Sequence, residues 1–155
     1  MGQGGAASTM ESDLIKLYST RILALTTDIP HLGRLEAPMG TWRERSPQCG
    51  SAVTVDVTVV DGVVAAFAQD VKACALGQAA AAVVGGAVIG QSRAEIAAAR
   101  DALAAMLRGG PTPAPPFEGL EVLQAARAYK NRHASIMLAF NATLGAFDQA
   151  VSRVA

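Results

Sequence analysis

The sequence predicts an α+β domain in which a small three-stranded antiparallel sheet is covered by helices. Three observations favour this class. A segment near the start carries apolar residues at helical spacing, the segments on either side of Asp61-Gly62 alternate like strands, and everything after Cys74 has a helical pattern. An order of helix, strands and then helices is typical of an antiparallel sheet whose apolar face is covered by helices.

The composition fits one domain and argues against several classes of partner. The chain has 155 residues, and its aromatic content of 5% indicates a core of Val, Leu and Ala. Its 13 basic and 13 acidic side chains cancel, which argues against nucleic acid or an anionic membrane surface as the main partner. No apolar run approaches the roughly 20 residues that span a bilayer. The Gly- and Ala-rich start lacks the features of a secretory signal. We therefore expect a cytoplasmic protein with a disordered tail at residues 1–10 and a single domain at residues 11–155.

The first elements follow from apolar spacing and from helix breakers. Apolar residues between Ser12 and Thr26 recur at helical spacing and predict the first helix. Asp28-Ile29-Pro30 ends this helix, and residues 31–40 are predicted to form a loop. Thr41 to Ser46 is predicted to be a short, exposed strand, which Pro47 ends.

The next two strands are predicted to form a hairpin. Val alternates with Thr and Asp over residues 52–60, which is typical of a half-buried antiparallel strand. Asp61-Gly62 lies between two Val pairs and is a strong hairpin signal, because a type I′ turn needs a positive φ at both central residues. A second strand, residues 63–71, then returns beside the first. Counting outward from the turn pairs Val57 with Ala66, Val53 with Asp70, Ser51 with Lys72, and Cys49 with Cys74. A bulge would shift this register by one residue.

The remainder of the chain is predicted to be helical. Residues 75–89 form an Ala-rich helix that stops at Gly90. Ser92-Arg93-Ala94-Glu95 is a capping box that opens a helix running to about Arg108. A Pro-rich connection over residues 111–116 leads to a short helix at residues 118–129 and a long terminal helix at residues 131–151.

The two cysteines are the residues most able to carry chemistry. In a reducing compartment, such a pair is more often metal-binding, reactive or inert than disulfide-bonded. Cys74 precedes a helix, whose positive end lowers the pKa of a thiol and favours the thiolate. Two convergent thiolates make half of a tetrahedral soft-metal site. The alternative is that both are inert. The two histidines, His31 and His133, are either solvated or candidate ligands. The sequence contains no Ser-His-Asp set, Walker A loop or dinucleotide fingerprint.

Four short segments form an ordered pattern over about residues 12–147. They are His31-Leu32-Gly33-Arg34-Leu35, Pro47-Gln48-Cys49-Gly50-Ser51 with the hairpin and Cys74-Ala75-Leu76-Gly77, Gly90-Gln91-Ser92, and Arg132 to Phe140. This order resembles the U-type iron–sulfur cluster assembly scaffolds, the family of IscU, SufU and the N-terminal domain of NifU. In the same order, the motifs of that family are Asn-x-Gly-x-Leu, Cys-Gly-Asp with Gly-Cys, Gly-Lys-Ser/Thr, and Arg-x-x-Cys-x-x-Leu-x-Trp.

The chain departs from this pattern at two ligand positions. The family's Asp after Cys-Gly is Ser51 here, and its third cysteine falls at Ser135. A register shifted by one would place Ala134 there, directly after His133, similar to the His-Cys of IscU. We prefer Ser135, because the flanking Arg, Leu and Phe then match as well. The third thiolate is absent in either register, and a serine hydroxyl, which stays protonated at neutral pH, is a poor ligand for a soft metal.

The resemblance implies a non-enzymatic binding protein with an IscU/SufU-like fold. Cys49 and Cys74 would hold iron or a nascent 2Fe-2S cluster, with sulfur from a cysteine desulfurase, and would pass it to an apo iron–sulfur protein. Ser51 would replace the Asp that tunes cluster lability, and Arg132 would lie at the rim of the site. His133 would be a substitute ligand if the last helix presents it.

Two alternatives stay open at this stage. One is a degenerate paralogue that binds no cluster and acts as an interaction or regulatory module. The other is a zinc site that modulates a desulfurase. The missing ligands weaken this alternative most, because structural zinc takes four ligands. A homodimer in which a second chain supplies ligands also stays open.

Overall fold

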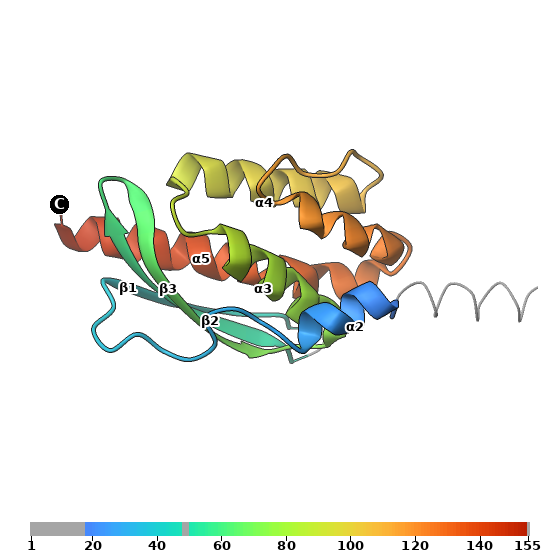
Figure 1. The fold of residues 1–155 in the computed structure, drawn as a ribbon, viewed down its shortest axis with the longest axis horizontal. Coiled ribbons are helices and arrows are strands. Elements are labelled where there is room, and N and C mark those ends of the chain that lie inside the picture. The colour runs from blue at the N-terminus through green and yellow to red at the C-terminus, as the bar shows by residue number, and fades with distance from the viewer. Residues whose placement is uncertain (1–17, 48–49, 155) are drawn as a thin grey trace, which may run out of the picture.

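The computed structural model describes residues 18–47 and 50–154, and it has the predicted α+β architecture (Figure 1). Its elements are α2 (Thr20–Thr26), β1 (Gly40–Arg45), β2 (Ala52–Val60), β3 (Val63–Lys72), α3 (Ala75–Ala87), α4 (Arg93–Leu107), the 3-10 helices η1 (Glu118–Ala126) and η2 (Lys130–Arg132), and α5 (His133–Val154). The predicted tail at residues 1–10 and the predicted start of the first helix at Ser12 lie outside the described residues.

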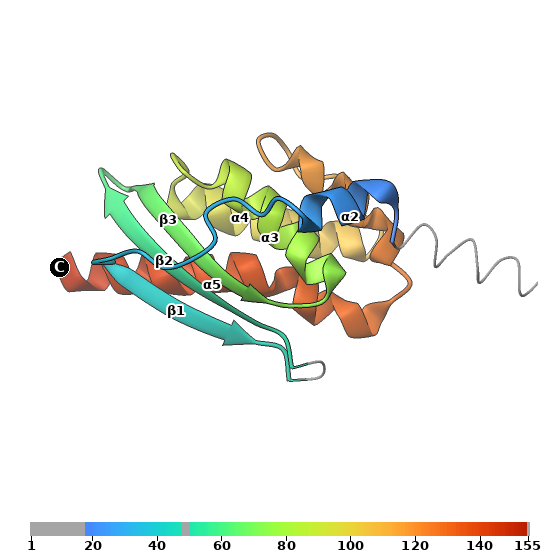
Figure 2. The ribbon, with the colours of Figure 1, turned by 60° about the horizontal axis from the view of Figure 1, so that its bottom comes forward.

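The predicted three-stranded sheet is confirmed, with the strand order β1-β2-β3 and antiparallel pairing throughout. Its apolar face is covered by α5, which packs against β1 and β2, and by α3, which packs against β3 and α5. α4 and η1 form an outer layer on these two helices (Figure 1). The segment between α2 and β1 runs along β3 and over the opposite face of the sheet (Figure 2).

The core lies between the sheet and the helices and is built from medium and small side chains. Val53, Val55 and Val57 of β2 are buried beneath Leu76 of α3 and Phe140 of α5, within one apolar cluster. The buried alanines of α3 allow that helix to approach its neighbours closely, because they add little bulk between the backbones. A core of small and medium side chains therefore goes together with closely packed helices.

The hairpin turn is confirmed, but the predicted register of its strands is wrong beyond the first two pairs. Asp61 and Gly62 have φ values of 53° and 78°, as a type I′ turn requires. After the pair Val59–Val64 a bulge leaves Ala65 without a partner on β2. Every later pair is shifted by one residue: Val57 lies opposite Phe67, Val53 opposite Val71, and Ala52 opposite Lys72.

The bulge is explained by which side chains must face the core. Without it, the charged Asp70 would share the buried face of the sheet with Val53, and Phe67 would point away. A shift of one residue exchanges the two faces of a strand. Phe67 and Gln69 therefore become buried, while Asp70 is exposed. Gln69 is accommodated because its Nε2 donates to the carbonyls of Pro30 and Ala81, at 3.1 and 3.0 Å.

The predicted helices are present, but two of them differ from the prediction. Ser19 is extended and caps α2, so the helix predicted from Ser12 to Thr26 does not run unbroken through residues 18–19. The capping box of α4 is formed: Ser92 Oγ accepts from the N–H of Glu95 at 3.2 Å, and Glu95 Oε1 accepts from the N–H of Ser92 at 2.9 Å. The predicted helix at residues 118–129 is instead the 3-10 helix η1. Its three residues per turn align positions three apart. Leu120, Leu123 and Ala126 therefore form one fully buried face.

No helix within the described ranges 18–47 and 50–154 is both long and apolar enough to cross a membrane.

Candidate functional site

Cys74 caps the N-terminus of α3, directly after β3. Its backbone is extended, with φ −66° and ψ 170°, and its thiol is free and half-buried. The second predicted ligand, Cys49, lies outside the described residues, and so does its predicted approach to Cys74. The described residues on either side of it are linked to each other: the N–H of Ser46 donates to the carbonyl of Ser51 at 2.8 Å, and the N–H of Gly50 donates to the carbonyl of Ser46 at 3.2 Å. One thiol of the predicted pair is therefore placed, together with the residues that flank the other.

One serine hydroxyl contacts this thiol, and a second contacts the first. Ser135 Oγ of α5 lies 3.5 Å from Cys74 Sγ and 3.3 Å from Ser51 Oγ, within hydrogen-bonding distance of both. Both serines are buried. This placement of Ser135 is the one that the preferred register predicts, whereas Ala134 of the shifted register is exposed and lines a groove elsewhere. The structure thus brings together three sequence-predicted residues from three separate segments.

A glycine of α3 makes room for this arrangement. A Cβ added at Gly77 would lie 2.6 Å from Ser135 Oγ and 2.8 Å from the Cβ of Ala73. Any side chain at this position would therefore push α3 away from the first turn of α5. The close approach of the two helices places the hydroxyl within contact distance of the sulfur.

The surroundings of Cys74 favour its thiolate form. Burial by itself raises the pKa of the thiol, but hydrogen bonding from Ser135, the N–H groups of Gly77 and Leu76, and the Arg132 side chain together lower it below its ordinary value. Neither N–H makes a well-formed capping hydrogen bond to the sulfur, yet both face it from the first turn of α3. This is the helix-terminus effect expected from the sequence, assisted by a cation and a hydroxyl.

Arg132 and His133 are adjacent in sequence, but their side chains contact different parts of the protein. Arg132 is a hydrogen-bonding neighbour of the Cys74 thiol, at the rim of the site. The imidazole of His133 donates from Nε2 to the carbonyl of Ala126 at 2.9 Å. It precedes Ser135 by two residues of α5, which corresponds to about 200° around a helix. His133 therefore points away from the serine that contacts the thiol, and this placement does not support it as a substitute ligand.

The described residues do not complete a metal site on their own. No group of three or more His, Cys, Asp and Glu side chains within the ranges 18–47 and 50–154 could hold a metal ion. The hydroxyl that contacts Cys74 is that of Ser135, and hydroxyls bind soft metals weakly. Only Cys49 would add a second thiolate. The site therefore suits weak or transient binding of a thiophilic ion more than a tight structural metal.

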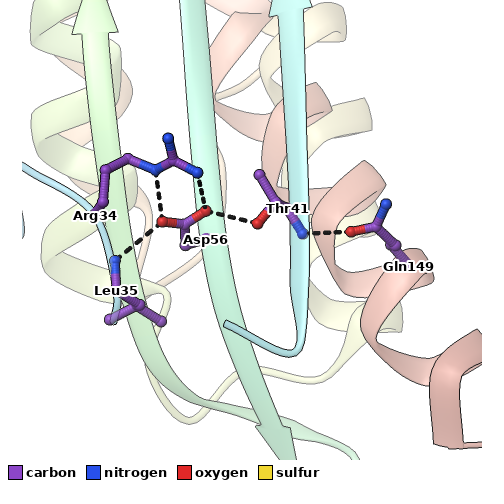
Figure 3. A network of polar contacts seen from close by, with 5 residues as sticks. All are labelled: Arg34, Leu35, Thr41, Asp56 and Gln149. Atoms are coloured by element: carbon purple, nitrogen blue, oxygen red, sulfur yellow. Dashed lines mark hydrogen bonds and ion pairs between the residues drawn. The ribbon is translucent and has the colours of Figure 1, made fainter. Parts of the chain in front are cut away.

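An ion pair between the buried Asp56 and the half-exposed Arg34, on the opposite face of the sheet, was not predicted from the sequence. Asp56 is fully buried, and its carboxylate accepts from Arg34 Nε and Nη2 at 2.7 and 3.0 Å, from the N–H of Leu35 at 3.0 Å and from Thr41 Oγ1 at 2.8 Å (Figure 3). The N–H of Thr41 donates to Gln149 of α5. The available signal was one acidic residue among the Thr residues that alternate with Val along β2. This network holds the segment before β1 against the sheet.

Three solved structures resemble this fold and architecture. A nitrogen-fixing NifU-like protein (N-terminal) from Brucella abortus is 39% identical, with a TM-score of 0.87, and the match covers 91% of this chain and 99% of that one. A hypothetical protein is 25% identical, with a TM-score of 0.75 and coverage of 86% and 98%. A protein from Fervidobacterium islandicum AW-1, assigned as an iron–sulfur cluster assembly scaffold for the SUF system, is 18% identical, with a TM-score of 0.75 and coverage of 86% and 98%. The last likeness is evidence for the fold alone. No protein-family model and no curated protein matches the sequence.

Proposed function

Since the chain belongs to the U-type iron–sulfur cluster assembly scaffold family, we propose that it is a divergent scaffold that holds iron or a nascent 2Fe-2S cluster through Cys49 and Cys74. It would receive sulfur from a cysteine desulfurase, pass the assembled cargo to an apo iron–sulfur protein in the cytoplasm, and catalyse no reaction itself. The cluster in this proposal is cargo and not a resident cofactor.

The observation that carries this proposal is the contact between Ser135 and Cys74. The fold brings a side chain from α5 to the thiol, at the position where the family pattern has its third cysteine. The side chain there is a hydroxyl, which is nearly the size of a thiol but remains protonated at neutral pH. In this proposal the position of a third ligand is kept while its charge is lost.

This arrangement predicts weak retention of the cargo. Two thiolates and neutral hydroxyls provide less negative charge than three thiolates and a carboxylate. We expect the purified protein to be colourless and either metal-free or only partly loaded. Any cluster that forms should be labile and sensitive to oxygen.

Anaerobic reconstitution with iron and sulfide tests the proposal. Iron and sulfide content should be low in the wild type, clearly higher in Ser135→Cys, and absent in Cys74→Ala. Cys74→Ala should cost little stability, because its thiol is half-buried and its loss opens no large cavity. Ser152→Cys is a matched control, since it adds a thiol at an exposed position near the other end of α5.

The controls separate the cluster proposal from its main alternative. A gain of iron in Ser135→Cys but not in Ser152→Cys would support position 135 as a site for a third ligand. If the wild type, Ser135→Cys and Cys74→Ala all stay empty, the cluster proposal is wrong.

A degenerate module that binds no cluster is the second candidate. The observation that favours it is the hydrogen bond between the buried hydroxyls of Ser135 and Ser51, which gives each of them a protein partner without a metal. In this case the chain keeps the fold as an interaction or regulatory partner. A zinc-binding desulfurase partner is tested in the same experiment by measuring zinc content after reconstitution with that ion.

A further inference from the structure

An open groove of about 870 Å³ lies between the end of α4 and the first turns of α5. Its floor is apolar and includes Leu107 of α4, Ala128, and Ala134 and Met137 of α5. Ala134 is exposed and Met137 is only half-buried, so the floor is open to solvent. Small side chains let a partner's backbone come close, and methionine adapts its shape to what binds it.

The rim of the groove is positively charged. The cationic residues that line it are Arg108, Arg127 and Lys130, and none of the lining residues in the described part of the chain is Asp or Glu. Arg108 and Lys130 are exposed and come from two separate segments, the end of α4 and η2. A segment lying in the groove would therefore meet cations from both.

Arg127 keeps this rim positive and fixed in shape. Its Nε donates to the carbonyl of Met106 at 2.8 Å, and its Nη2 donates to the carbonyl of Gly110 at 2.7 Å. These carbonyls belong to the C-terminal end of α4 and the turn after it, where a helix carries partial negative charge. Because the guanidinium satisfies them, the end of α4 does not offset the charges of Arg108 and Lys130.

The groove shares a wall with the thiol site. Lys130 and His133 line the groove, whereas Arg132, between them in sequence, is a neighbour of the Cys74 thiol. A partner that fills the groove would therefore contact the segment that carries Arg132. Cargo exchange at Cys74 and docking in the groove would then occur on neighbouring faces of the same segment.

We propose that this groove docks an amphipathic helix of a partner protein, with an apolar stripe flanked by carboxylates. Apolar lining residues together with cations from two segments match that pattern in polarity and charge. This inference rests on the proposed scaffold role, which requires partner proteins to approach Cys74. Its chemistry is independent of any metal, because the groove residues include no thiol.

The test uses two synthetic helical peptides with the same Leu stripe, one flanked by Glu and the other by Lys. Each carries a fluorophore and is titrated with the full-length, metal-free protein while anisotropy is recorded. The Glu peptide should bind and weaken as salt is raised, because salt screens exposed charges. The Lys peptide should not bind.

Variants place the binding in the groove. Ala134→Glu adds bulk and a like charge to the floor and should weaken the Glu peptide by more than about tenfold. Lys130→Glu should weaken it as well. Arg153→Glu is the matched control, because it reverses an exposed charge in the last turn of α5 and should change nothing.

Several results would overturn the proposal. Equal binding of both peptides, or unchanged binding by Ala134→Glu, would show that the groove is not selective for this chemistry. Self-association that Ala134→Glu abolishes would show that a second copy of the chain occupies the groove. A negative peptide result leaves the iron content of Ser135→Cys unaffected, so failure here is distinct from failure of the scaffold proposal.

Discussion

The contact between Cys74 and Ser135 depends on a hydroxyl at a position where a cysteine would present a thiol. An oxygen in place of a sulfur at Ser135 preserves the contact with the neighbouring thiol, and Gly77 still leaves room for it. The hydroxyl also acts on Cys74 directly, because its hydrogen bond favours the thiolate. Ser135→Cys would therefore add a second thiol beside Cys74 and remove one of the groups that keep Cys74 ionised.

The pKa of the Cys74 thiol leads to a prediction about its reactivity. Because that pKa lies below its ordinary value, alkylation by iodoacetamide should already be fast at a pH where a free cysteine is mostly protonated. Ser135→Ala and Arg132→Gln each remove a group that lowers the pKa, so both should move the pH–rate profile to higher pH. The rates are measured by mass spectrometry in a Cys49→Ala background, which leaves Cys74 as the only thiol.

Two results would contradict this account of the thiol. The profile of Cys74 could coincide with that of an unstructured cysteine peptide. Alternatively, Arg153→Gln, which removes an exposed cation in the last turn of α5 as a control, could shift it as much as Arg132→Gln does.

At the scale of residues, the sequence predicts part of the site and leaves part open. Ser135 is placed by the residues that flank it, and the helix-end effect on Cys74 follows from the order of strand and helix. His133 could not be assigned from sequence, because the direction of its side chain depends on where η2 gives way to α5. The burial of Asp56 requires the segment after α2 to cross the sheet, which no local pattern near Asp56 indicates.

The contact between α3 and α5 depends on one glycine, and the chain offers a second glycine for comparison. Gly77 is buried against Ser135 and Ala73, whereas Gly86 of the same helix is exposed, with only a Pro30 side-chain atom near, at 3.8 Å. Alanine favours a helix over glycine by about 1 kcal/mol. The same substitution should therefore have opposite effects at the two positions.

We expect Gly86→Ala to raise the free energy of unfolding by up to about 1 kcal/mol. Gly77→Ala should lower it, because the new Cβ would lie 2.6 Å from Ser135 Oγ and the helices must separate. Urea unfolding followed by circular dichroism measures both. If Gly77→Ala gained stability and left the pH–rate profile of Cys74 unchanged, the close approach of α3 to Ser135 would not depend on glycine at position 77.

At the scale of elements, periodic patterns predict the existence of helices and strands better than their pairing. Asp61-Gly62 defines the turn, and Ser92 with Glu95 defines the start of α4. The bulge at Ala65 is not visible in the turn itself. It could have been inferred from Phe67 and Val71, which must share a face with the Val residues of β2. The 3-10 form of η1 follows from buried residues three apart, a spacing that a short α-helix also tolerates.

Over the whole molecule, one buried carboxylate joins three parts of the fold. Asp56 of β2 holds Arg34 and Leu35 of the crossing segment and Thr41 of β1, and the backbone of Thr41 is held by Gln149 of α5 (Figure 3). Arg34 belongs to the segment that resembles the family's Asn-x-Gly-x-Leu motif. The network thus fixes that segment on the face of the sheet opposite the helices.

The charge of Asp56 makes the stability of the fold dependent on pH. Burial raises the pKa of this carboxyl, but hydrogen bonds from Arg34, Thr41 and the Leu35 N–H, with the charge of Arg34, lower it overall from its usual 3.8. A carboxyl whose pKa is lower in the folded protein contributes stability at pH values above its unfolded pKa. That contribution is lost as the pH falls through the folded pKa. The folded protein should therefore lose stability below about pH 4.

Asp56→Asn should remove this acid-sensitive contribution. At pH 7 it should cost roughly 1–3 kcal/mol, the range for buried hydrogen bonds to a charged group, tempered by the half-exposed Arg34. The cost should shrink as the pH falls, because the wild type then loses the same interaction. Urea unfolding from pH 3 to 7 measures it, with the exposed Asp101→Asn as the control. An equal cost of Asp56→Asn at every pH would mean that Asp56 stabilises the fold by shape and hydrogen bonding alone, without its charge.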